Sequence, residues 1–312
     1  CDFGEIVAAV GLTPSELSNV SYVGQTVRHR REPKPRATTE QRITLEARAY
    51  RASRALDQRI REGDEALREL LATQYGIDSA TSFFDLGVGL ETNDEGRDFL
   101  VAFTRDSEGR IAWLQRREVS DGRLVGDWLS ARNPDKGTET ETRYDAVGAF
   151  GTWRGTGPLL VAEGASDGLT LAALGRYDVL AVRGASMAEQ IDDARDLLLG
   201  RDVIVLADND DAGERMTRAV IDRIGPYTNS TSYVRWANDA KGYDVRDFRS
   251  EAPDAFPSRL ARLVTGAERV YRKGADSFDT DQYVGRGDEG VAAAIRDYVR
   301  HLGYDLAHTK ER

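Results

Sequence analysis

Cysteine is almost absent from this chain of 312 residues, in which Cys1 is the only one. A single thiol cannot form an internal disulfide, so a disulfide-stabilised secreted fold is excluded and a reducing cytoplasm is expected. Histidine is scarce too, with three residues at positions 29, 301 and 308. These counts mean that the chain cannot build a structural zinc site from cysteine and histidine ligands.

Long apolar runs are also missing. No stretch has membrane-spanning length and the N-terminus does not have the form of a signal peptide, so we expect no membrane partner. The chain contains no Gly-Lys-Ser/Thr, which excludes a P-loop ATPase domain. The net charge of −10 argues against bulk electrostatic attraction to nucleic acid, although it is compatible with a local basic groove.

Two short apolar runs, each followed by acidic residues, form the central pattern of the sequence. Residues 159–162 lead into Glu163-Gly164, and residues 203–207 lead into Asp208-Asn209-Asp210. Neither run alternates, which is typical of strands buried on both faces, and a helical pattern follows each. Strand–helix–strand–helix order predicts an α/β fold with parallel strands, whose carboxyl ends meet at one sheet edge. Glu163, Asp208 and Asp210 are therefore expected to converge.

Three clustered carboxylates repel one another unless one holds a proton or a divalent cation lies among them. Ligand sets made of oxygen suit Mg²⁺ or Mn²⁺. Asp208 and Asp210 leave a strand end on the same side, so they can share one ion. Two further acids that could join the cluster, Asp244 and Asp247, follow in the segment 241–247.

This pattern resembles the Toprim domain, which has Glu-Gly after one strand and Asp-x-Asp-x-Ala-Gly after a later one. Glu163-Gly164 and residues 208–213 (DNDDAG) match those motifs, and Asp167 matches the primase form of the first. The resemblance implies a catalytic, metal-binding triad of Glu163, Asp208 and Asp210. The alternative is that Asp208 and Asp210 only cap a helix, which leaves Glu163 unexplained.

The region before these motifs resembles the polymerase core of bacterial DnaG-type primases. Tyr75-Gly76-Ile77 resembles the end of a helix in those cores. Residues 106–110 (DSEGR) resemble a hairpin that leads to basic residues. The resemblance implies a nucleotide- and DNA-binding role for a set of basic side chains: Arg116, Arg117, Arg132, Lys136 and Lys241. Strand alternation sends Arg116 and Arg117 to opposite faces, so one of the two is expected to line the groove. Surface salt bridges are the alternative for each.

The resemblance therefore implies a primase, of phage or prophage type, that makes RNA primers on single-stranded DNA from nucleoside triphosphates. A replicative helicase, in trans or fused, is the implied partner. A Toprim nuclease acting on DNA is the main alternative. A topoisomerase needs a separate tyrosine-bearing domain, and a non-enzymatic contact module often lacks the acids that are present here.

Five segments are expected along the chain. Residues 1–37 would be the end of a zinc-binding domain and a basic linker. The reason is that Cys1 resembles the last zinc ligand of that domain and is followed by a similar helix. Zinc would then be held only in a preceding part that this fragment lacks. Residues 38–75 would be helical, 76–157 a mixed α+β subdomain that ends in a flexible glycine-rich joint, 158–250 the Toprim domain and 251–312 a helical tail.

Overall fold

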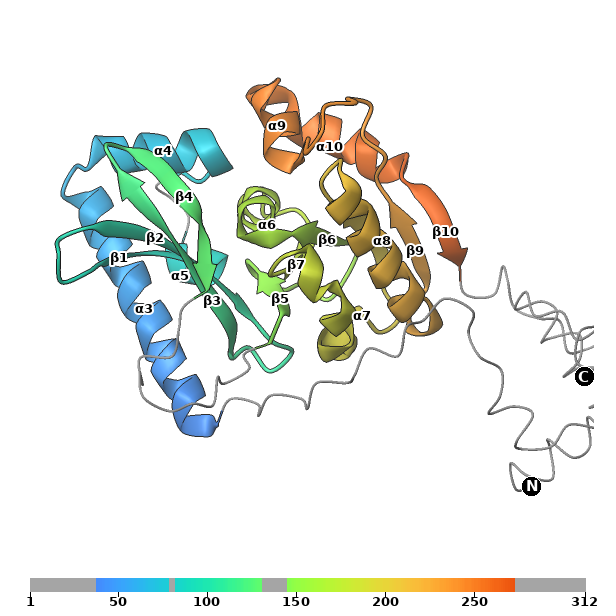
Figure 1. Cartoon of the computed structure of the whole chain (residues 1–312), viewed down its shortest axis with the longest axis horizontal. Coiled ribbons are helices and arrows are strands. Elements are labelled where there is room, and N and C mark those ends of the chain that lie inside the picture. Colours follow the sequence, from blue (N-terminus) through green and yellow to red (C-terminus); the bar gives the residue numbers. More distant parts are fainter. Residues whose placement is uncertain (1–37, 79–81, 131–144, 273–312) are drawn as a thin grey trace, which may run out of the picture. The chain divides into compact units, whose positions relative to one another are not determined.

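The computed structural model describes residues 38–78, 82–130 and 145–272 (Figure 1). All of them belong to one compact unit, residues 34–275. The expected linker at 1–37, the basic residues Arg132 and Lys136, and the part of the expected helical tail after residue 272 lie outside the described residues.

The N-terminal helices begin and end where the sequence predicts. Helix α3 (Thr39–Arg61) starts at a capping box, in which Thr38 and Gln41 bond reciprocally through side chains and backbone. Its apolar stripe, from Leu45 to Ile60, is buried. Helix α4 (Glu65–Tyr75) follows and ends at Gly76, whose φ of 72° is left-handed. The short helix α5 (Phe83–Leu86) leads into the sheet.

A sheet of ten strands runs through the described part of the chain. The spatial order is β10-β9-β8-β6-β7-β5-β2-β3-β4, with β1 paired to β2. The strands are β1 (Val88–Thr92), β2 (Asp98–Arg105), β3 (Ile111–Ser120), β4 (Arg123–Ser130), β5 (Val147–Phe150), β6 (Leu159–Glu163), β7 (Asp178–Val182), β8 (Asp202–Leu206), β9 (Ser230–Tyr233) and β10 (Glu268–Arg272).

The C-terminal part of the sheet contains the parallel unit. Strand β6 pairs in parallel with both β7 and β8, and β8 pairs in parallel with β9. The remaining pairs are antiparallel, including the β2–β3 hairpin predicted around residues 106–110. This arrangement confirms the α/β class, and it brings the carboxyl ends of β6 and β8 side by side.

Helices cover both faces of the parallel unit (Figure 1). Leu160 and Ala162 of β6 face a core shared with α6 (Gly164–Ala173), α9 (Val245–Ser250) and α10 (Phe256–Thr265). Leu159 and Val161 face the opposite core, shared with η1 (Ala185–Ala194), α7 (Arg195–Leu198) and α8 (Asp211–Ile224). Burial on both faces explains why β6 has an unbroken apolar sequence.

The expectation of a flexible joint at 148–157 is wrong. Residues 147–150 form β5, which pairs with β7 at four positions and with β2 at Arg105, so the sheet is continuous across the expected boundary. Gly148 is required by packing, because a Cβ there would lie 2.3 Å from Thr104 Oγ1. Gly148 permits close contact between strands, and the sequence pattern alone does not distinguish this role of a glycine from a flexible segment.

The segment after β5 is held by a buried ion pair. Asp178 accepts hydrogen bonds from the backbone N–H groups of Arg154 (2.7 Å) and Gly155 (2.9 Å), and from Arg201 Nη2 (2.8 Å). Arg201 also donates to the carbonyl oxygens of Thr156 and Gly157. Because a charge buried without its partner is costly, these contacts fix the path of the chain into β6.

Candidate metal and phosphate site

The acidic side chains of the two motifs lie at the ends of adjacent strands. Glu163 is the last residue of β6, and Gly164, with a φ of 76°, turns the chain directly into α6. Asp208 and Asp210 follow β8. Asp210 Oδ1 accepts from the backbone N–H groups of Ala212 (2.8 Å) and Gly213 (2.9 Å), so Asp210 does cap α8. The capping interpretation thus holds for one oxygen of Asp210, while Asp208 makes no such cap.

Gly213 brings the start of α8 against Asp208. A Cβ at position 213 would lie 2.0 Å from the carbonyl oxygen of Asp208. Only glycine allows this approach, because the clashing atom is backbone and cannot swing away. The DNDDAG motif is therefore a compact turn that fixes where the Asp208 side chain emerges.

The closest group of carboxylates combines Asp208 with two acids that the sequence marks as additional candidates. Asp167, Asp208 and Asp244 each offer an oxygen within 4.8 Å of the others. Asp167 lies in the first turn of α6 and Asp244 is the N-cap of α9; their exposures are 2% and 6%. Asp247 instead completes the capping box of α9 with Asp244. The position of Asp208 at the sheet edge follows from the order of the strands. The positions of Asp167 and Asp244 depend instead on how α6 and α9 pack together in the folded domain.

The pKa values show a strained acidic cluster. Burial, followed by the negative charges of Glu163, Asp244 and Asp210, raises the pKa of Asp208 to about 8. Burial is also the main cause that raises the pKa of Asp167 well above its usual range, and it raises that of Glu163. Glu163 Oε2 and Asp167 Oδ1 are buried without a hydrogen-bond partner. Several converging carboxylate oxygens with unmet bonding capacity fit a hard divalent cation.

This cluster predicts how stability changes with pH in EDTA. The folded pKa of Asp208, about 8, is above the ordinary 3.8. The stability that protonated Asp208 contributes to the folded state is therefore fully present below about pH 4 and is lost as the pH rises toward 8. Between pH 6 and 8.5 we expect a loss on the order of 2 kcal/mol after solvent screening, measured as a falling melting temperature. The Asp208→Asn variant should show a smaller fall, and equal slopes for both proteins would contradict this account.

A pocket of about 250 Å³ opens beside the cluster and contains basic side chains. Arg117, Arg183 and Arg246 line it together with Glu163, Asp167, Asp208 and Asp244. Arg117 Nε is buried there without a hydrogen-bond partner. Arg116 lies elsewhere, with its guanidinium 4.6 Å from the centre of the Phe99 ring. The alternation of β3 therefore places Arg117, and not Arg116, beside the acids.

Several residues of this pocket were not identified from the sequence. Trp128 comes from β4, an edge strand with mostly exposed side chains and no buried apolar run to reveal it, and its Nε1 donates to Ser166 Oγ at 2.8 Å. Arg183 follows β7, a strand that we did not expect between the two acidic motifs. Arg246 stands two positions after Asp244, and this spacing inside the first turn of a helix is the signal that could have pointed to it.

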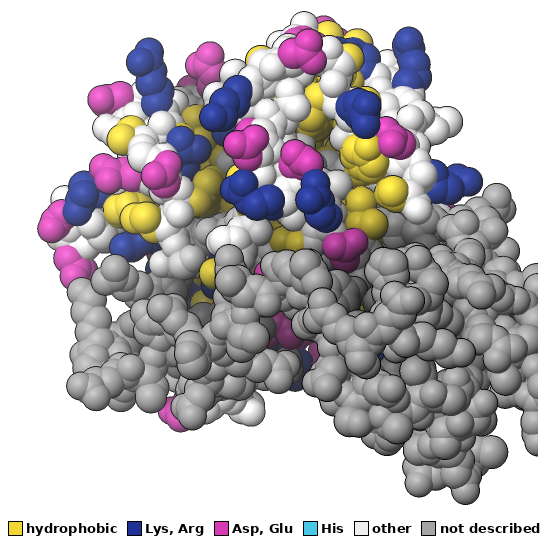
Figure 2. Space-filling view, turned by 45° about the vertical axis from the view of Figure 1, so that its right-hand side comes forward, with side chains coloured by type: hydrophobic (Ala, Val, Ile, Leu, Met, Phe, Trp, Pro, Cys, Tyr) yellow, Lys and Arg dark blue, Asp and Glu magenta, His cyan; other side chains and the backbone are white. Residues whose placement is uncertain are grey.

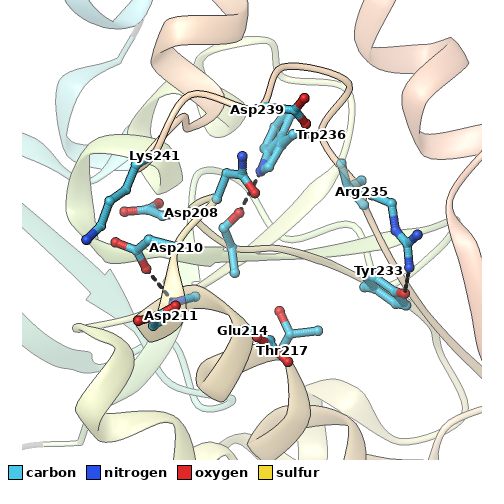
Figure 3. Close-up of a pocket in the computed structure, with 14 residues that line it drawn as sticks. Asp208, Asp210, Asp211, Glu214, Thr217, Tyr233, Arg235, Trp236, Asp239 and Lys241 are labelled. Carbon is cyan, nitrogen blue, oxygen red and sulfur yellow. Dashed lines mark hydrogen bonds between the residues drawn. The ribbon is translucent and has the colours of Figure 1, made fainter.

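A second pocket, of about 520 Å³, is also lined by Asp208 (Figure 3). Lys241 extends beside Asp208 and Asp210, and Arg235 and Trp236 also line the pocket. Trp236 Nε1 donates to the carbonyl oxygen of Ala207 at 2.7 Å, which anchors the loop after β9 to the end of β8. Asp208 thus borders both pockets, with Arg117 in one and Lys241 in the other.

On the face that Figure 2 shows, basic and acidic side chains of the described residues are interspersed. Among the described helices, none combines the length and the apolar character that crossing a membrane requires.

Comparison with known proteins identifies part of the chain. Residues 158–253 match the family model of the Toprim domain. Among solved structures, the zinc-binding and RNA polymerase domains of the Aquifex aeolicus primase match 86% of this chain and 69% of theirs, at 16% identity with a TM-score of 0.52. The chain is also similar to the RNA polymerase domain of the Mycobacterium tuberculosis primase DnaG, where the match covers 86% of this chain and 94% of that one, at 17% identity with a TM-score of 0.45. The match to the primase fragment of the bacteriophage T7 primase-helicase covers 61% of this chain and 71% of that one, at 20% identity with a TM-score of 0.44.

No curated protein matches the chain. With its TM-score above 0.5, the likeness to the Aquifex aeolicus protein shows a shared fold. The family match confirms the domain predicted from Glu163-Gly164 and the DNDDAG motif. Residues 158–253 match the Toprim domain family, and the chain shares its fold with the zinc-binding and RNA polymerase domains of that primase.

Proposed function

We propose that this chain is a DNA primase that makes short RNA primers on single-stranded DNA by metal-dependent nucleotidyl transfer. The observation that carries the proposal is that Arg117 and Lys241 line two pockets that both border Asp208, a member of the buried carboxylate cluster. Phosphoryl transfer needs acids to hold cations and basic groups to hold phosphates, and little covalent chemistry from the protein. The Toprim match and the primase fold support this assignment.

Each group has a proposed role. Glu163, Asp208 and Asp210 hold Mg²⁺ or Mn²⁺, which when bound neutralises charge on the reacting phosphates, and Asp167 and Asp244 complete the acidic cluster beside them. Arg117 orients phosphate oxygens from the smaller pocket, since its guanidinium can donate two parallel bonds. Lys241 offers a point charge from the larger pocket. Arg132 and Lys136 remain predicted contacts to nucleotide or template, and a replicative helicase remains a predicted partner.

The test is template-directed synthesis by the purified chain. Single-stranded DNA and nucleoside triphosphates are incubated with Mg²⁺ or Mn²⁺, and di- and oligonucleotide products are separated on a gel. We expect products that depend on the template and on the metal. Cutting of DNA without any extension would overturn the proposal and establish the nuclease alternative.

Arg117 and Arg116 offer a matched pair of variants in the same assay. Arg117→Ala should lower synthesis by about a hundredfold, mainly by raising KM for the triphosphate, because a charge-assisted contact to phosphate is worth about 1.5–3 kcal/mol. Arg116→Ala removes an arginine that lies over Phe99 and should stay within about threefold of the wild type. Equal losses in both variants would remove Arg117 from the phosphate site.

A further inference from the structure

Arg246 lies inside the acidic cluster, where a cation is expected. Its Nη2 and Nε are 2.7 Å and 3.2 Å from Asp244 Oδ2. Its Nε is also 3.7 Å from Asp167 Oδ1. A single guanidinium thus spans two of the three carboxylates whose oxygens lie within 4.8 Å of one another. Asp167 and Asp244 are both more than nine-tenths buried, so water cannot replace this charge cheaply.

The guanidinium and a divalent ion would compete for the same oxygens. Mg²⁺ and Mn²⁺ bind carboxylate oxygens at about 2.1 Å, so an ion bridging Asp167 and Asp244 would need the position that Arg246 holds. If both were present, the ion and the guanidinium would lie roughly 4 Å apart with strong repulsion. Glu163 Oε2, by contrast, is buried without a hydrogen-bond partner. Asp208 is close to both sets of groups, because its carboxylate lies within 4.8 Å of those of Asp167 and Asp244 and it follows the strand that neighbours that of Glu163.

We propose that Arg246 is a built-in counter-ion that fills one of two cation positions in this cluster. The chain then binds a single divalent ion tightly, at Asp208 and Glu163, and the Asp167–Asp244 side stays neutralised by the protein itself. Arg246 thereby sets the metal stoichiometry of the site. The inference rests on the cation site proposed above and is independent of whether the bound metal serves primer synthesis.

The experiment counts Mn²⁺ ions on the full chain, by isothermal titration calorimetry and by electron paramagnetic resonance of free Mn²⁺. The wild type should bind one ion in the tight phase. Arg246→Gln should bind two, and its first ion about tenfold or more tighter, because a nearby positive charge is gone. Arg246→Lys keeps the charge and should restore one ion. Arg259→Gln is the control, since Arg259 also pairs with an acid, Glu251, but does not line this pocket.

Two results would overturn the inference. One is a wild-type chain that binds two Mn²⁺ ions tightly, which needs no variant and holds even if Arg246→Gln fails to fold. The other is an Arg246→Gln protein that is folded, by its circular dichroism, and binds Mn²⁺ with wild-type number and affinity. Primer synthesis is not part of the readout, so failure here is distinguishable from failure of the proposed function.

Discussion

Replacing Asp208 by asparagine should abolish primer synthesis and, in EDTA, raise the melting temperature. The loss of activity should be on the order of a thousandfold or more, because a carboxylate that holds the cation supplies several kcal/mol of charge stabilisation in the transition state. Stability should rise because burial and the charges of Glu163, Asp244 and Asp210 raise the pKa of Asp208 to about 8. An uncharged amide removes that repulsion. Primer gels and thermal melts on the same preparations measure both effects.

Two other variants make this experiment specific. Asp210→Asn should also lose synthesis while the melting temperature stays close to that of the wild type, since asparagine caps helices about as well as aspartate. Asp222→Asn changes an exposed acid on the same helix, α8, and should alter neither property. If Asp208→Asn retained synthesis, this carboxylate would not belong to the catalytic set. If it lost synthesis and also melted much earlier, its role would be structural.

Gly213→Ala should destabilise the protein strongly, although alanine is the better helix former. Helix propensity alone favours alanine by about 1 kcal/mol. Against this, the new Cβ would lie 2.0 Å from the carbonyl oxygen of Asp208, far inside van der Waals contact. Overpacking that forces backbone to shift costs about 1–3 kcal/mol and occasionally more, and a contact this short with backbone belongs at the upper end of that range, so the clash should dominate. Chemical denaturation gives the free energy of unfolding.

The comparison for this variant is Ala219→Gly, which lies further along α8 and removes a partly buried methyl group together with the helix propensity of alanine. It should cost about 1 kcal/mol through propensity, plus a smaller loss of packing. Gly213→Ala should cost clearly more and should weaken Mn²⁺ binding, because the turn that positions Asp208 is displaced. A Gly213→Ala protein as stable as the wild type would show that the turn can open without penalty.

Sequence reasoning reached those parts of the fold that local patterns determine. The helical segment that starts at residue 38, the buried strands β6 and β8, and the meeting of Glu163 with Asp208 at one sheet edge all follow from local sequence patterns. Strand β4 was not predicted because most of its side chains are exposed, so it lacks a buried apolar run. Strand β10 lies in the segment that was expected to be a helical tail, but it pairs with β9.

The candidate site was harder to predict where it depends on helices that pack from elsewhere. Asp167 and Asp244 were identified only as possible additions, because nothing local says that the first turns of α6 and α9 meet at Asp208. Arg246 was missed for the same reason. A residue's place in a motif can be read from the sequence, whereas its neighbours across a helix interface depend on packing of the whole domain.

The continuous sheet has a consequence for how ligands are received. Arg117 stands on β3 and Asp208 follows β8, and both strands belong to one hydrogen-bonded sheet through β5. The groups proposed to bind phosphate and cation thus stand on one continuous sheet. For the proposed reaction, this common frame preorganises their spacing before a nucleotide arrives, which spares the free-energy cost of assembling the site. Ligand-driven adjustment is then left to side chains and loops at the sheet edge.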